Sequence, residues 1–475
     1  MSVARSDDSR RAASAHPDDG TDVSASERRA KGKALRAVVP RTSHAGWKPG
    51  AERSDPVELL VASNVGRVSE LIPIRFGRMS ASPFAFYRGS AALMAADLAT
   101  TPTSGLRVQA CGDSHLMNFG GFATPERNVV FDINDFDETL PAPFEWDLKR
   151  LAASAVVAAQ HLRLPVSDAA GLAAACACEY RERMNDYSEM SALEVWYDKI
   201  DLQRFEDRAG DPKVVKSMRE RLAARIESQG AKTAPARAYP KLVTQKEARP
   251  RIKDQPPLIY HPSPDLFPGL EAAYTEAFAA YRESLPDHVQ VLFDRFSLYD
   301  AAMKVVGVGS VGTVCGVGLF LGTVGNPLFL QVKEARASVL EPYAGKSAYR
   351  SHGQRVVAGQ HLMQTASDIF LGWTRVKSGR HFYLRQLHDV KISADIDGWD
   401  AGLLREYARI CARTLARAHA RSGDAAMMSG YLGSGPTFDD AIAAFAVDYS
   451  AQNSRDYQAF QRSIRDGRIQ VNMET

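Results

Sequence analysis

The sequence predicts an α+β protein with two lobes, one helical and one rich in β-strands. Alanine-rich stretches over residues 145–190 and an apolar pattern of helical period within 400–465 predict long helices. Residues 292–392 contain β-branched, glycine-punctuated runs that are typical of strands. The chain has 475 residues, 45% of them hydrophobic and 24% charged, so it is long enough for two or three lobes.

The composition divides the chain into five segments. Residues 1–50 are polar, charged and poor in aromatic side chains, so we expect a disordered tail. Residues 51–190 are expected to form a helical lobe, which residues 393–475 complete. Residues 191–291 predict a helical, basic connector that joins this lobe to the β-rich lobe of residues 292–392.

One short span, Cys111 to Thr139, gathers side chains that suit a metal and phosphate site. These side chains are Asp113, His115, Asn118, Asp132, Asp135 and Asp137. Mg²⁺ takes oxygen ligands, usually one or two carboxylates plus substrate phosphates. A carboxylate that is not a ligand can accept the proton of an attacking hydroxyl. The alternative is an acidic, glycine-containing hairpin whose Asp and Asn side chains only cap turns.

A second signal lies in the β-rich segment, where a glycine pattern is followed by a lysine. Its residues are Gly307, Gly309, Ser310, Gly312 and Lys333. The run after the glycines, TVCGVGLFLG, is β-prone, whereas a dinucleotide fold needs a helix there. Strand, glycine turn, strand and a lysine on a later strand form the nucleotide-covering lobe of kinases. The alternative is a glycine-rich β-hairpin with a solvated lysine.

The first span resembles the protein-kinase-like superfamily, in particular its aminoglycoside and choline phosphotransferase branch. The matching residues are Gly112, Asp113, His115 and Asn118, then Asp135, Phe136 and Asp137, then the helix start EWDLKRLAAS. The resemblance implies ATP and Mg²⁺ as cofactors, with Asp113 as catalytic base. His115 is the second candidate catalytic residue, and we expect it to orient the loop by hydrogen bonding rather than to carry protons. The resemblance makes Asn118 and Asp135 the metal ligands. The stretch between these two is longer than usual in the branch, so Asp132 competes for the metal role, and Cys111 stands where the branch usually has His.

The two motifs occur in the reverse of the usual kinase order. The segments after Lys333, from ARASVLEPYAG to the amphipathic LLREYARICARTLARAHARSGD, continue the order cyclically back to Cys111. We therefore expect a two-lobed, kinase-like fold with a circular permutation, which chains tolerate where their termini lie in exposed loops. Glu341 is the expected carboxylate partner of Lys333, with Glu334 as its rival.

The whole chain also resembles an uncharacterised bacterial family, domain of unknown function 2252, over roughly residues 35 to 460. The segments that carry the resemblance include PIRFGRMSASPFAFYRGSA, CGDSHLMNFG, FDINDFDETLPAPFEWDLKRLAAS, QVKEARASVLEPYAGKS and HGQRVVAGQ. The family's activity is not established, and its grouping with kinase-like folds agrees with the motifs.

The expected function is ATP·Mg²⁺-dependent phosphoryl transfer to a hydroxyl of a small molecule or protein. Two alternatives stay open: AMP transfer on the same scaffold, and a nucleotide-binding pseudokinase that serves as a regulatory module. Arg88 either holds a phosphate or acidic substrate or forms a structural ion pair. A net charge of +3 is too small to indicate nucleic acid, and no apolar run predicts a membrane span. Five scattered cysteines favour a reducing, cytoplasmic location; the sequence defines neither the acceptor nor the oligomeric state.

Overall fold

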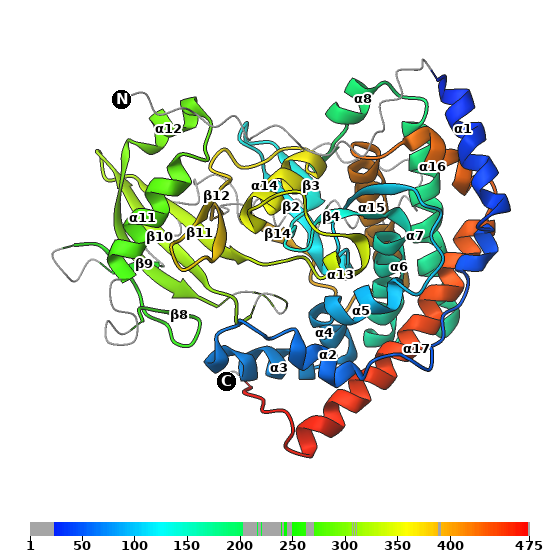
Figure 1. The fold of residues 1–475 in the computed structure, drawn as a ribbon, viewed down its shortest axis with the longest axis horizontal. Helices are drawn as coiled ribbons and strands as arrows, with labels where there is room; N and C mark the ends of the chain where they lie inside the picture. Colours follow the sequence, from blue (N-terminus) through cyan, green and yellow to red (C-terminus); the bar gives the residue numbers. More distant parts are fainter. Residues whose placement is uncertain are drawn as a thin grey trace.

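The fold is α+β, with several antiparallel sheets and a body of packed helices (Figure 1). The computed structural model describes residues 23–202, 242–244, 249–262, 270–305, 311–387 and 391–473, and also the single residues 216, 220, 239, 307 and 309. Among these residues, no helix is both long and apolar enough to span a membrane.

The largest sheet has six antiparallel strands in the order β12-β13-β11-β10-β9-β8. The strands are β8 (Ile259–Tyr260), β9 (Phe296–Lys304), β10 (Cys315–Gly322), β11 (Pro327–Ala335), β12 (Gly372–Arg375) and β13 (His381–Gln386). Helices α11 (Leu270–Arg282) and α12 (Asp287–Phe293) pack on one face through aromatic side chains such as Tyr281 and Phe293. The opposite face packs against the two-stranded sheet of β6 (Val243–Thr244) and β7 (Arg251–Ile252). Most of this lobe lies in the predicted segment 292–392, and β8 and α11 extend it into the expected connector.

A second, four-stranded sheet lies between the large sheet and the helices (Figure 1). Its order is β14-β2-β3-β5, from β2 (Phe119–Ala123), β3 (Val129–Ile133), β5 (Ile200–Asp201) and β14 (Lys391–Ser393). Beside it, β1 (Arg107–Ala110) pairs with β4 (Leu140–Pro143). One of the two loops that contain the predicted catalytic and metal residues therefore follows β1 of the two-stranded sheet, and the other follows β3 of the four-stranded sheet.

The helical body is built around one helix that is buried on nearly every side. Helix α6 (Phe144–His161) is buried from Phe144 to Ala159 and packs against α7 and α17. A helix that is buried all round belongs to the centre of a domain. The other helices of this body are α7 (Val166–Tyr187), α8 (Ala192–Tyr197), α15 (Ala401–Ala420), α16 (Ala425–Leu432) and α17 (Thr437–Arg465). The C-terminal segment thus completes the helical lobe by packing on the N-terminal one.

Four short helices lie between the end of α17 and the glycine loop of the large sheet. They are α2 (Pro56–Ala62), α3 (Ile72–Ser80), α4 (Pro83–Gly89) and α5 (Ala91–Leu98). Phe76, Phe86 and Phe460 join them to α17 in one apolar cluster. Figure 1 shows α3 beneath the sheet lobe and α5 beside α6. Further elements are α13 (Glu341–Ala344), α14 (His352–Met363) and the single turns η1 (Leu35–Ala37), η2 (Arg41–His44), η3 (Ser69–Leu71) and η4 (Leu116–Asn118).

The N-terminal segment differs from the expected disordered tail, because its residues from 23 onward are ordered. Helix α1 (Ala25–Ala34) begins at a capping box formed by Ser24 and Glu27, a local signal that favours a helix start. Gly32 lets α1 approach α16 closely, since a Cβ there would lie 1.9 Å from the Met427 carbonyl oxygen. The expected disorder of residues 1–22 lies outside the described residues.

Candidate functional site

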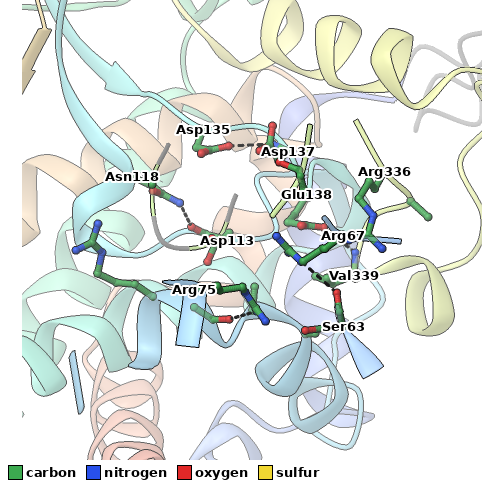
Figure 2. A pocket seen from close by; sticks show the side chains of 18 of the residues that line it. Ser63, Arg67, Arg75, Asp113, Asn118, Asp135, Asp137, Glu138, Arg336 and Val339 are labelled. Atoms are coloured by element: carbon green, nitrogen blue, oxygen red, sulfur yellow. Dashed lines mark hydrogen bonds between the residues drawn. The ribbon is translucent and has the colours of Figure 1, made fainter. Parts of the chain in front are cut away.

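A cavity of about 440 Å³ lies where the short helices, the glycine loop and the two site loops meet (Figure 2). Five carboxylates line it, together with four arginines: Asp113, Asp135, Asp137, Glu138 and Glu334, then Arg67, Arg75, Arg88 and Arg336. The predicted residues His115, Asn118, Gly307 and Gly309 also line it. The cavity therefore brings residues of the first motif together with two glycines of the second, whereas Lys333 and Gly312 are not among the residues that line it.

The first turn of α6 holds the loop that contains Asp113. The Asp147 carboxylate accepts hydrogen bonds from the Cys111 amide at 2.6 Å and the Gly112 amide at 2.9 Å. The Ser114 hydroxyl donates to the Asp147 carbonyl at 2.7 Å. Gly112 has a φ of 80°, and a Cβ there would lie 2.5 Å from the Glu138 carbonyl oxygen, so this position requires glycine. The sequence EWDLKR thus fixes the backbone just before Asp113.

Asp113 is held by an arginine and keeps one oxygen toward the cavity. Its Oδ1 accepts from Arg150 Nε at 2.7 Å and also from Arg150 Nη2, and its side chain is 19% exposed. Burial raises the pKa of Asp113 to about 6, although the Arg150 guanidinium opposes the shift. The Asn118 amide donates to the Asp113 carbonyl at 2.8 Å and ties the two predicted residues together. Asp113 is therefore a carboxylate that is ionised at neutral pH and can take up a proton.

His115 orients this loop. Its Nδ1 accepts the Met117 amide at 3.2 Å, and its Nε2 lies 3.9 Å from Asp113 Oδ2. Burial, helped by the nearby Arg150, lowers the pKa of His115 well below its usual value. The imidazole is therefore neutral at neutral pH, which suits a positioning role beside Asp113.

Lys333, from the large sheet, reaches the loop that contains Asp135 and Asp137. Its Nζ lies 2.9 Å from Asp137 Oδ2 and 3.7 Å from Asp135 Oδ2. The Tyr383 hydroxyl on β13 donates to Asp137 Oδ1 at 2.6 Å. Burial alone would lower the pKa of Lys333, but the carboxylates of Asp135 and Asp137 raise it well above its usual value. Burial acts to raise the pKa of Asp137, and the Lys333 ammonium outweighs it, so the net shift is downward. Both groups are charged at neutral pH.

Of the two competing metal carboxylates, only Asp135 faces the cavity. Asp132 is completely buried on β3, and its Oδ1 accepts from Arg417 at 2.6 Å while its Oδ2 accepts the Thr365 amide at 2.7 Å. Asp132 therefore anchors β3 to α15 and to the end of α14, away from the site. Asn118 and Asp135 line the cavity and carry amide and carboxylate oxygens, the ligand types that Mg²⁺ takes together with substrate phosphates. Among the described residues, no group of three or more His, Cys, Asp or Glu side chains is placed so that it could hold a metal ion.

The glycine loop lies against the segment between α2 and α3. Gly307 and Gly312 have φ values of 64° and 87°, which favour glycine. The Val68 amide donates to the Gly312 carbonyl at 2.7 Å, and Arg67 Nη1 donates to the Val311 carbonyl at 2.5 Å. Ser310, predicted to bind nucleotide with these glycines, lies outside the described residues.

The two glutamates expected to pair with Lys333 lie elsewhere. Glu341 begins α13, and its Oε1 is 3.9 Å from His352 Nδ1. Glu334 pairs with Arg380 at 3.0 Å and accepts the Val314 amide. Lys333 and Glu334 are neighbours on β11, so their side chains point to opposite faces of the sheet. This expectation is corrected, because Asp137 is the carboxylate nearest the lysine.

Glu138 is a cavity residue that sequence reasoning missed. Its Oε2 accepts the Val339 amide at 2.7 Å, and burial raises its pKa to about 7. Its position directly after Asp137 in the run DFDET was the available signal. Arg67, Arg75 and Arg336 were also missed, because Arg336 lies far along the chain from the other two and only the fold brings the three to one cavity.

The fold and the cavity define a class: an α+β protein whose polar site lies between a sheet lobe and a helical lobe. Residues 67–463 match the model of a family described as "Uncharacterized protein conserved in bacteria (DUF2252)". The chain belongs to this family. It has no significant match among curated proteins or among solved structures.

Proposed function

We propose that this chain is an ATP·Mg²⁺-dependent phosphotransferase with a circularly permuted, kinase-like fold. The observation that carries the proposal is the meeting of Lys333 with Asp135 and Asp137 beside Asp113, from two segments far apart in the chain. This is the set of groups that phosphoryl transfer requires: a cation for the phosphates, ligands for the metal, and a carboxylate for the acceptor proton.

The order of the strands supports the fold part of the proposal. The glycine loop connects β9 to β10, and Lys333 lies on β11, the next strand of the same sheet. Helix α14 follows before β12 and packs against β11 and β13. Kinases likewise carry the glycine loop first, the lysine on the third strand and a helix after it.

Helix α14 acts on the acidic loop through an arginine in place of a glutamate. Arg355 donates to the carbonyls of Asp137 and Thr139 at 2.8 and 2.6 Å. In kinases a glutamate of this helix pairs with the lysine. Here Asp137 pairs with Lys333, and α14 fixes the backbone that presents Asp137.

Each residue would then have a defined task. Asn118 and Asp135 would hold Mg²⁺, which neutralises phosphate charge when bound. Lys333 would bind phosphate oxygens, and Gly307 and Gly309 would cover them. The acceptor oxygen would bond to the γ-phosphorus as the bond to the β–γ bridging oxygen breaks, ADP would leave with that electron pair, and Asp113 would take the hydroxyl proton. Catalysis would rest on positioning and charge.

Two substitutions in the full chain test the assignment. Asp113→Asn should keep Mg²⁺·ATP affinity within about twofold and reduce turnover by at least about a hundredfold, because general-base catalysis contributes on that scale. Asp135→Ala should weaken Mg²⁺·ATP binding itself. The matched control is Asp466→Asn, an exposed carboxylate after α17. ATP consumption during a screen of hydroxylated metabolites and proteins gives turnover, and wild-type turnover in both site variants would contradict the proposal.

The same experiment separates the two alternatives. A product that carries AMP, identified by its mass, would indicate nucleotidyl transfer. Metal-dependent ATP binding without turnover on any acceptor would favour a nucleotide-binding module. The observation that favours the nucleotide-binding module is the pairing of Lys333 with Asp137, because kinases pair this lysine with a glutamate.

A further inference from the structure

Four arginines line the cavity without a carboxylate partner among the described residues. Arg67 donates to the Val311 and Ser63 carbonyls, and Arg336 donates to the Val65 carbonyl. Arg75 donates to Asn64 Oδ1 at 2.7 Å and to the Gly89 carbonyl at 2.9 Å. These acceptors are neutral, so they satisfy hydrogen bonds but leave the positive charges without a counter-ion. Uncompensated buried charge is costly, and a bound anion would relieve it.

Arg88 has the fewest contacts of the four. Within the described part of the chain, its guanidinium has neither a hydrogen bond nor an ion pair, and its Nε is buried. Arg75 is only 2% exposed, and its Nε also has no partner there. The structural ion pair considered for Arg88 from the sequence is therefore not formed with any described residue.

Arg88 lies on the side of the predicted catalytic base. Asp113 is the charge that acts on Arg88, where it opposes the lowering of the arginine's pKa by burial. The charges that act to raise the pKa of Lys333 are Asp135 and Asp137. Figure 2 shows Asp113 between Arg75 on one side and Asp135 and Asp137 on the other. Arg75 and Arg88 are thus suited to the acceptor, while Lys333 and the glycine loop are suited to the nucleotide.

Asp113 forms no ion pair with Arg88, and one of its two carboxylate oxygens, Oδ1, is taken up by Arg150. The Arg150–Asp113 pair uses two donors on one carboxylate oxygen. Arginine presents a planar fork of donors that matches the oxygens of phosphate or carboxylate. A cavity that contains two such groups beside a general base is suited to an acceptor that carries negative charge.

We propose that Arg88 and Arg75 form an oxyanion subsite for the acceptor, so that the acceptor carries a phosphate or carboxylate group besides the hydroxyl that is modified. This inference rests on the proposed phosphotransferase function for the meaning of "acceptor". The subsite itself is a binding site for an oxyanion and can be tested without turnover.

The test is calorimetric titration of the full chain with inorganic phosphate, and separately with acetate, in the presence of Mg²⁺ and a saturating non-hydrolysable ATP analogue. Wild type should bind phosphate or acetate, and Arg88→Met should weaken that binding by about tenfold or more, the usual scale for losing a charge-assisted hydrogen bond. The affinity for the ATP analogue should change by less than about twofold. Arg405→Met removes an exposed arginine of α15 outside the cavity and should change neither affinity. The preferred anion tells a phosphorylated acceptor from a carboxylated one.

The outcomes separate this inference from the proposed function. If Arg88→Met weakens binding of the ATP analogue and leaves phosphate and acetate binding unchanged, Arg88 binds the nucleotide. The inference is then wrong, while the phosphotransferase assignment stands. Equal anion binding by wild type and variant, or none by wild type, also overturns it. If no nucleotide binds but an Arg88-dependent anion does, the oxyanion subsite stands and the proposed function fails. If Arg88→Met does not fold, Arg88→Lys replaces it as the test variant. Lysine keeps the positive charge but lacks the planar guanidinium donors, so anion binding should be weakened by a smaller factor.

Discussion

The ion pair between Lys333 and Asp137 joins the sheet lobe to the acidic loop, and its contribution can be measured. Lys333 is 4% exposed and Asp137 is 23% exposed, with 2.9 Å between Nζ and Oδ2. Breaking a buried pair from one side costs roughly 3–5 kcal/mol. In Lys333→Met, Asp137 would remain partly exposed to solvent and keep the hydrogen bond from the Tyr383 hydroxyl. We therefore expect this substitution to lower the free energy of unfolding by about 3 kcal/mol, at the low end of that range.

Asp137→Asn should cost less, since Lys333 would keep Asp135 at 3.7 Å. The double variant should then be less destabilised than the sum of the single variants, with an interaction energy of about 1–3 kcal/mol. The assay is urea unfolding of all three variants, monitored by tryptophan fluorescence, and the comparison requires that the m-value does not change between variants. Lys346→Met, at an exposed lysine, is the matched control. Additivity of the two substitutions within about 0.5 kcal/mol would refute the reasoning.

Three further outcomes follow from the site. Burial raises the pKa of Asp113 to about 6, so the proposed base is ionised above that pH and neutral below it. Turnover should therefore rise with pH and level off above about 6. The Glu138→Gln variant should show the same rise at the same pH, and a shift in the midpoint of the rise would instead assign the titration to Glu138. Asp132→Ala should lower the free energy of unfolding by roughly 3–5 kcal/mol, because it leaves a buried arginine of α15 unpaired, yet calorimetry of the folded variant should show unchanged Mg²⁺·ATP affinity. Gly112→Ala should reduce turnover and lower the free energy of unfolding in urea by about 1–3 kcal/mol. The control is Gly105→Ala, at a glycine with a similar φ of 85° and open space around it, which should show only the cost of backbone strain and keep wild-type turnover.

The part of the site that is contiguous in sequence was predictable. Asp113, Asn118 and Asp135 lie on two loops joined by a short hairpin of β2 and β3, so local spacing is enough to bring them together. The helices of the C-terminal segment were also predictable, because their apolar period is strong. The choice between Asp132 and Asp135 was not, since it depends on Arg417, a residue far along the chain that pairs with Asp132.

The carboxylate partner of Lys333 was predicted wrongly for a related reason. Sequence reasoning looked for a glutamate after the lysine, but α14 carries none and presents Arg355 to the Asp137 backbone. Arg88 was weighed from the sequence, but the cavity arginines Arg75 and Arg336 were missed because they come together with it only in the folded chain. Order in α1 was missed because its stability comes from packing on α16, which its polar composition does not show.

The central claim is that ATP binds with Mg²⁺ between the glycine loop and the loops that contain Asp113 and Asp135. The most direct measurement is calorimetric titration of the full chain with ATP, with and without Mg²⁺, in wild type and Asp135→Ala. We predict binding at one site that depends on Mg²⁺ and is weakened by about tenfold or more in the variant. No ATP binding under either condition, or equal binding in all four titrations, would contradict the account.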